Sequence, residues 1–227
     1  MSEQTDRKYY QNIRSGGIAE RLLVSARNRI YANLIHACAP SPASTILDVG
    51  VSDVVNDGAN LLERLYPFPD RITACGLGSA PDFRSAFPRI EYVQIEPGLP
   101  LPFRDRQFDI ATSNAVLEHV GSVRNQLRFL NELCRVGRTV FVSVPNRYFP
   151  IEHHTAIPLL HWRDGSFRAA CAVLGRNDWQ LEKNLILMTK RRLAELLPGS
   201  RQWTIGYTGL PLGALSSNLF AVSKGCA

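Results

Sequence analysis

The stretch TILDVGVSDVVNDG, from Thr45 to Gly58, begins like the first strand and loop of a nucleotide-binding sheet. A short apolar run is followed by an acid and a glycine, and the further glycines of a dinucleotide loop are missing. Such a loop needs GxGxxG at the start of a helix, where backbone N–H groups bind a pyrophosphate. Here Val51, Ser52 and Asp53 follow the glycine, and an acid disfavours two phosphates. The loop therefore predicts a nucleoside ligand rather than a dinucleotide.

Short apolar runs typical of strands recur on both sides of this loop. They span residues 45–49, 72–75, 91–95, 108–113 and 139–144. Residues 56–65 and 122–135 lie between them and carry apolar side chains at helical spacing. Alternating strands and helices predict an α/β fold, with a parallel sheet covered by helices on both faces.

The two ends of the chain extend this pattern. Residues 18–38 have an apolar residue at every fourth position, which predicts an amphipathic helix. After Pro145 the chain becomes rich in Pro, His and aromatic residues, with a helix predicted over 165–174. A short helix with Thr189 as its N-cap and two strand-like runs that form an edge hairpin complete the chain. We therefore expect one domain over residues 1–227, with 1–40 as a helical arm or lid and 146–188 as an inserted segment over the site.

Composition narrows the class of protein. The 227 residues are 45% hydrophobic, enough for a substantial core, and the net charge of +6 is spread along the chain rather than gathered into runs. Nucleic-acid binding is therefore unsupported. The five cysteines form no CxxC pair and have no histidine at ligand spacing, which predicts reduced thiols and no metal site. The sequence has no window of about 18 apolar residues, and we expect a cytoplasmic protein. The oligomeric state is open.

Four segments, in this order, resemble the class I S-adenosylmethionine-dependent methyltransferases, and within them the type 11 methyltransferase domain group. They are ILDVGVSD, GLPLPFRDRQFDIATSNAVLEHV, RVGRTVFVSVPNR and MTKRRLAELLPG, and together they cover nearly the whole chain. The second segment, with its LPF, FD and LEH spacing, is the most specific. The resemblance implies a doubly wound, Rossmann-like, mostly parallel seven-stranded sheet with an antiparallel terminal strand. It also implies S-adenosyl-L-methionine as cofactor, and the acids near the loop suit its positive sulfonium.

Carried over by motif, the resemblance assigns eight residues to the cofactor. Asp48 and Gly50 would lie beneath its methionine part, and Glu96 would contact the adenine. The others are Ser52, Asp53, Gly78, Ser113 and Asn114. For several of them a structural role is an open alternative. Asp48 could be a helix cap at the strand end, Glu96 could lie in an exposed turn, and Ser113 and Asn114 could simply be the polar end of a strand.

The second strand departs from the family pattern, in which an Asp or Glu at its end holds the ribose hydroxyls. Here the strand ends in Gly76, Leu77 and Gly78, and the first acid is Asp82. Losing a hydrogen bond to a carboxylate, about 1.5 to 3 kcal/mol, would weaken cofactor binding about ten- to a hundredfold unless another group replaces it. Asp82 or Ser79 are the first candidates, and Asp53 and Asp57 of the first loop, or backbone contacts at the glycines, are the alternatives.

Methyl transfer to a hydroxyl benefits from a general base, whereas transfer to an acid or a neutral amine needs none. The candidate catalytic residues are His154, Glu118 and His119. His153 and His154 are adjacent, so an extended chain brings only one of them into the cleft. A helix-dipole role for Glu118 and a core role for His119 are the structural alternatives.

We therefore expect methyl transfer to the oxygen or nitrogen of a small-molecule acceptor. RNA methylation and a catalytically silent binding protein with this fold are the alternatives, supported by the basic charge and by the missing second-strand acid, respectively. A nicotinamide-dependent reductase is disfavoured because GxGxxG and a Tyr-xxx-Lys pair are absent. The sequence leaves the acceptor open.

Overall fold

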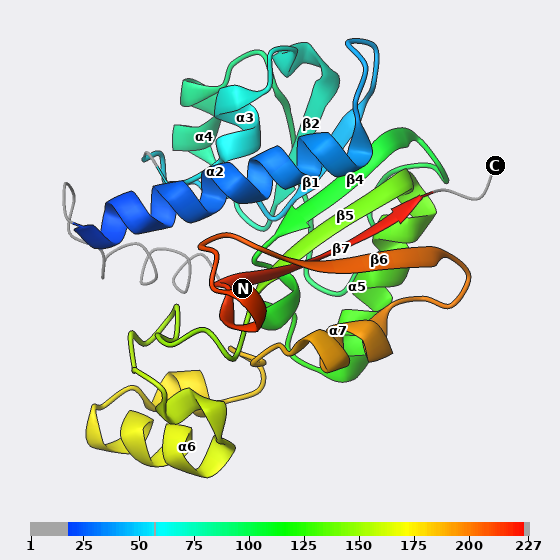
Figure 1. The fold of residues 1–227 in the computed structure, drawn as a ribbon. Coiled ribbons are helices and arrows are strands. Elements are labelled where there is room, and N and C mark those ends of the chain that lie inside the picture. The colour runs from blue at the N-terminus through cyan, green and yellow to red at the C-terminus, as the bar shows by residue number, and fades with distance from the viewer. Residues whose placement is uncertain (1–17, 57, 225–227) are drawn as a thin grey trace.

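A computed structural model describes residues 18–56 and 58–224, which are built around a seven-stranded sheet (Figure 1). The strand order is β3-β2-β1-β4-β5-β7-β6. Strands β1 to β5 pair in parallel, whereas β7 is antiparallel to both β5 and β6. The strands are β1 (Ile46–Val49), β2 (Ile72–Gly76), β3 (Glu91–Gln94), β4 (Phe108–Asn114), β5 (Gly137–Pro145), β6 (Gln202–Thr208) and β7 (Asn218–Lys224). The predicted sheet and its antiparallel terminal strand are confirmed.

Helices cover both faces of this sheet because successive strand residues point to opposite sides. In β1, Ile46 packs with α2, α3 and α4, whereas Leu47 packs with α5 and α7. The helices are α2 (Ile18–Cys38), α3 (Leu61–Leu65), α4 (Pro81–Ala86), α5 (Val123–Val136), α6 (Asp164–Val173) and α7 (Lys190–Leu196). Short 3₁₀ turns span Pro69–Arg71, Leu117–His119, Leu160–Trp162, Asn177–Gln180 and Gly213–Leu215. Figure 1 shows α2 running across the sheet.

Helix ends follow local capping chemistry. The Ser122 hydroxyl accepts the N–H of Asn125 at 3.2 Å and begins α5, and Thr189 caps α7 as predicted. The helix expected over 56–65 is wrong in length, since α3 begins only at Leu61. Asn60, with a left-handed φ of 51°, binds the backbone of Ser52 through its side-chain amide and so belongs to the β1 loop.

The segment over residues 146–188 leaves the sheet at the end of β5 and forms a small lobe around α6 (Figure 1). It has its own apolar core of Ile157, Phe167, Cys171 and Leu185. The lobe returns to the sheet where the N–H of Ile186 donates to the Glu118 carbonyl at 2.8 Å. This connection brings the inserted segment against the end of β4.

Two further expectations concern cysteines and membrane segments. Within the described ranges, the four cysteines Cys38, Cys75, Cys134 and Cys171 are free. None of the helices that the structure describes has the length and apolar character needed to cross a bilayer. The part of the expected lid that includes Tyr9 and Tyr10 lies outside the described residues.

Candidate active site

A cleft opens at the carboxyl ends of β1 and β4, where an open parallel sheet places its ligands. Six predicted site residues border it: Asp48, Gly50, Ser52, Asn114, His119 and His154. Helix α2 contributes Arg27 and Tyr31, which the sequence analysis did not single out. Helical periodicity identified the apolar face of α2 but could not show that its polar neighbours lie over the cleft.

Gly50 makes the tight turn from β1 into the cleft. Its φ is +100°, and its N–H donates to the Cys75 carbonyl at 2.7 Å. A Cβ at this position would lie 2.2 Å from Cγ2 of Val116, which follows the end of β4 and packs against the turn. Glycine is therefore required here by conformation and by space.

Two carboxyl groups lie side by side at the end of β1. Asp48 borders the cleft, and Glu63 of α3, which is only 4% exposed, interacts with the Asp48 carboxyl group. Burial raises the pKa of Asp48 to about 7, and burial together with the charge of Asp48 raises the pKa of Glu63 well above its usual value. Neither carboxyl group forms an ion pair with a described residue, and a cationic ligand group would add a positive charge to the cleft that Arg27 also borders. Glu63 was missed because LLERL is typical of a surface helix.

The other predicted cofactor residues have structural partners. Ser113 donates its hydroxyl to the Val49 carbonyl at 2.8 Å and joins β4 to β1. Asp53 accepts the N–H of Phe83 at 3.0 Å, in the first turn of α4. Asn114 borders the cleft and accepts the hydroxyl of Ser143. Glu96 is exposed, and it does not border the cleft.

The end of β2 lacks the family's acid, as the sequence analysis noted, and a tyrosine lies over it. The hydroxyl of Tyr92 donates to the carbonyl of Gly78 at 2.6 Å. A Cβ on Gly76 would lie 2.9 Å from the same hydroxyl. Asp82 is exposed in α4 and does not border the cleft. Tyr92 and Gln94, whose Nε2 donates to the Leu77 carbonyl at 3.3 Å, are therefore polar side chains at this strand end, and their place in the neighbouring strand gave no signal of that.

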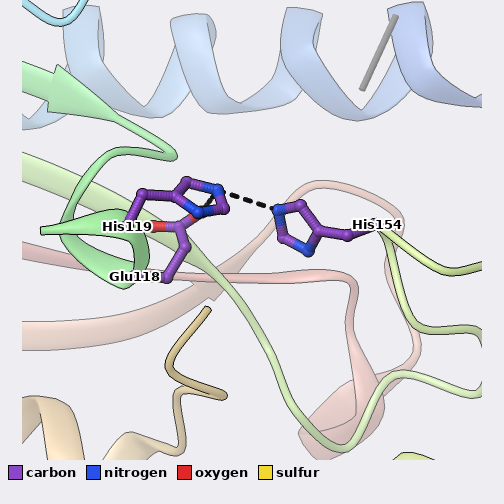
Figure 2. A group of neighbouring side chains, drawn as sticks. All are labelled: Glu118, His119 and His154. Atoms are coloured by element: carbon purple, nitrogen blue, oxygen red, sulfur yellow. Dashed lines mark hydrogen bonds and ion pairs between the residues drawn. The ribbon is translucent and has the colours of Figure 1, made fainter. Parts of the chain in front are cut away.

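The three predicted catalytic residues form one buried cluster (Figure 2). Nε2 of His119 and Nε2 of His154 are 3.0 Å apart, and a Glu118 oxygen is 3.9 Å from His119 Nε2. Nδ1 of His119 faces the Asn184 carbonyl at 2.6 Å, and Nδ1 of His154 faces Glu152 at 2.8 Å. His154 borders the cleft and His153 does not, but the two residues lie in a turn rather than in the extended chain that the alternation assumed, and both border a second, smaller pocket.

Burial and neighbouring charges shift the pKa values of the groups in this cluster in different directions. Burial lowers the pKa of His119 to about 3 and raises the pKa of Glu118 to about 7. For His154, burial acts to lower the pKa, but the Glu152 carboxylate outweighs it and the pKa is raised. Burial opposes ionisation of Glu152, yet His154 and Thr155 bring its pKa down to about 2. Glu152 is thus the anchoring carboxylate of the cluster, and sequence reasoning overlooked it.

Comparisons with known proteins agree with this architecture. None of the curated proteins matches the chain. A S-adenosylmethionine-dependent methyltransferase from Thermotoga maritima shares 13% identity with a TM-score of 0.58, covering 92% of this chain and 95% of that one. A second, from Methanosarcina mazei, shares 15% identity with a TM-score of 0.56, covering 86% and 98%. The N-methyltransferase NodS from Bradyrhizobium japonicum, in complex with S-adenosyl-L-homocysteine, shares 11% with a TM-score of 0.54, covering 88% and 87%.

The family model described as a methyltransferase domain matches residues 23–181, which is well over half of the chain. The matched region includes the β1 loop, the end of β4 and most of the inserted segment. The strand order and the position of the cleft agree with the same assignment. The chain therefore belongs to the methyltransferase domain family and has the fold of the class I S-adenosylmethionine-dependent methyltransferases.

Proposed function

We propose that the protein binds S-adenosyl-L-methionine and transfers its methyl group to an oxygen or nitrogen of a small-molecule acceptor. The observation that carries the proposal is the pair of carboxyl groups of Asp48 and Glu63 beside the cleft, neither of which forms an ion pair with a described residue. A dinucleotide would bring phosphates to the same place, where these acids would repel them. A cofactor with an ammonium and a sulfonium group suits the pair.

The residues at the end of β1 have the chemistry to hold this cofactor. Asp48 and Glu63 would attract its amino group, and Gly50 lets the ligand approach the backbone closely. When bound, the cofactor supplies a methyl group on a carbon that the sulfonium already activates for displacement. The protein's part is to align the acceptor and to exclude water, an effect of about 7 to 11 kcal/mol in well-aligned systems.

The acceptor side is formed by His119, His154 and the inserted segment. We propose that residues 146–188 cover the acceptor and that α2 closes another wall of the cleft in a single domain. All four ring nitrogens of the two histidines face a polar atom within 3.0 Å. A histidine that acts as general base must therefore first open the contact between the two Nε2 atoms.

Calorimetric titration tests the choice of cofactor. We expect saturable binding of S-adenosylmethionine and of its demethylated product, and none of NADH, because the cleft has a carboxyl pair and no phosphate cradle. Saturable NADH binding with no response to S-adenosylmethionine would contradict the proposal. Binding of neither ligand would favour a silent domain with this fold.

Asp48→Asn should have opposite effects on ligand affinity and on stability. Affinity for the demethylated cofactor should fall about tenfold or more, since a charged hydrogen bond contributes about 1.5 to 3 kcal/mol. Asp48 has a pKa of about 7 in the fold against an ordinary 3.8, so the folded protein holds a proton that the unfolded chain releases between these values. The free energy of unfolding of the wild type therefore falls as pH rises through this window. The Asp48→Asn variant has no carboxyl group at this position, so its free energy of unfolding does not fall for this reason.

The measurements are calorimetric affinity and urea unfolding of the ligand-free protein at pH 4 to 8. As pH rises to about 7, the free energy of unfolding of Asp48→Asn should increase relative to that of the wild type, and above this pH the difference between the two should stay constant. Asp82→Asn is the matched control because this exposed acid lies outside the cleft. This control should change neither the ligand affinity nor the free energy of unfolding. Reduced affinity in Asp82→Asn would indicate that Asp82 is the acid that holds the ribose.

A further inference from the structure

The cluster of Glu118, His119 and His154 lies at the boundary between two hollows. His119 and His154 border the cofactor cleft, whereas Glu118 and His154 border a second, smaller pocket under the inserted segment. One ligand atom from each of the three side chains lies within 4.8 Å of the others. Figure 2 shows the two rings directed toward each other, with the carboxyl group beside them. A group bound here would touch both the cofactor side and the acceptor side.

The outer contacts of the two rings fix where their protons are. Nδ1 of His119 faces a backbone carbonyl, which only accepts, so this nitrogen carries a hydrogen. Nδ1 of His154 faces Oε1 of Glu152, whose Oε2 accepts the N–H groups of His154 and Thr155 and the hydroxyl of Thr155. This nitrogen is therefore also a donor. Two neutral rings so oriented hold their two Nε2 lone pairs 3.0 Å apart with no hydrogen between them, an arrangement that a positive charge bound by both nitrogens would relieve.

Glu118 decides which positive charge fits the cluster. Its side chain is 1% exposed, and neither carboxyl oxygen has a hydrogen-bond partner among the described residues. A proton shared by the two rings would relieve the contact between the nitrogens but would leave both of these oxygens unsatisfied. A divalent cation would satisfy the carboxylate and both rings at once, which removes the cost of a buried unpaired group.

The distances agree with a metal site. Two ligands about 2.1 Å from one ion and at right angles to it are about 3.0 Å apart, which is the separation of the two Nε2 atoms. The carboxyl oxygen lies 3.9 Å from His119 Nε2 and would have to turn toward the two nitrogens to complete the set. Two imidazoles and one carboxylate suit first-row divalent transition metals with open positions. The carbonyl and carboxylate on the two Nδ1 atoms are the outer contacts that orient such ligands.

We propose that Glu118, His119 and His154 bind a divalent transition-metal cation, with Zn²⁺ or Mn²⁺ as the best matches to the donor set. Three protein ligands leave positions open for an oxygen of the acceptor. A cation there would lower the pKa of an acceptor hydroxyl and so replace the protein base that the engaged histidines do not readily provide. This role rests on the proposed function, whereas the binding site itself does not. No metal was expected from the sequence because the cysteines form no CxxC pair and have no histidine at ligand spacing, whereas His119 and His154 are 35 positions apart.

The test uses Co²⁺ as a spectroscopic probe of the untagged, full-length protein after treatment with a chelator. We expect one equivalent of Co²⁺ to bind saturably and to produce visible ligand-field absorption. Glu118→Gln, which keeps the shape and removes the charge, should weaken Co²⁺ affinity at least tenfold, and His154→Gln should weaken it further. His36→Gln is the control because His36 is an exposed histidine away from the cluster, and it should bind Co²⁺ as the wild type does.

Circular dichroism of each variant establishes that it is folded before its affinity is compared. No saturable Co²⁺ absorption in the folded wild-type protein would overturn the proposal. Equal affinity of Glu118→Gln and wild type would also overturn it, because the buried carboxylate would then not be a ligand. A parallel titration with S-adenosyl-L-homocysteine separates the two proposals: Co²⁺ binding without a response to this ligand supports the metal site and contradicts the proposed function.

Discussion

Replacing Glu152 by Gln should lower the free energy of unfolding by about 3 to 5 kcal/mol, the usual effect of removing one partner of a buried pair. Glu152 is 3% exposed, and its two oxygens accept four hydrogen bonds from His154 and Thr155. The side-chain amide of glutamine has only one acceptor oxygen. Its NH₂ group is a donor and would therefore face other donors: either the three that bond to one carboxyl oxygen of Glu152, or the imidazole N–H that bonds to the other. In a chain of 227 residues this corresponds to a fall in Tm of about 6 to 20 °C.

Thermal and urea unfolding at pH 7 measure this effect. Glu195→Gln is the matched control, since Glu195 pairs with Arg191 while both side chains are more than half exposed. Its change in unfolding free energy should stay within about 0.5 kcal/mol. If the two variants had equal stability, Glu152 would not anchor the loop that carries His154. The Co²⁺ affinity of Glu152→Gln should also fall, because the His154 ring would lose the contact that orients it.

The sheet could be predicted from the sequence because the property that forms it is local. The apolar runs are buried on both faces in a parallel sheet, so each run identifies a strand without knowledge of its neighbours. Thr189 could likewise be read as a helix cap, since the capped N–H group is only three residues away. The helix expected over 56–65 was shorter than predicted because Asn60 bonds back to Ser52, a contact that apolar periodicity does not report.

The candidate site was predicted less completely because its contacts join distant residues. Asp48 and Gly50 could be placed by motif, whereas Glu63 matters only because α3 folds back onto the end of β1. Tyr92 reaches the end of β2 from the neighbouring strand, and Glu152 is visible as a partner of His154 only after the loop is folded. The cluster of Glu118, His119 and His154 forms only once the inserted segment packs against the end of β4. Such contacts between elements leave no regular spacing in the sequence.

Gly50→Ala should lower the free energy of unfolding by about 2 to 6 kcal/mol and abolish binding of S-adenosyl-L-homocysteine. One part of the loss, about 1 to 3 kcal/mol, comes from the backbone, because a φ of +100° is unfavourable for any residue with a Cβ. The other part, also about 1 to 3 kcal/mol, comes from the new Cβ, which would lie 2.2 Å from Cγ2 of Val116. Moving either group shifts the turn at which the cofactor is proposed to meet the backbone.

A double-mutant cycle separates the two parts. Val116→Ala removes the clashing methyl groups, so in this background Gly50→Ala should cost about 1 to 3 kcal/mol less than in the wild type, while the backbone part persists. Gly165→Ala is the matched control because this helical glycine in α6 has open space around its Cβ position. It should stabilise the protein by about 0.5 to 1 kcal/mol, since alanine is the better helix former. Equal effects of Gly50→Ala in both backgrounds would show that Val116 does not restrict this turn.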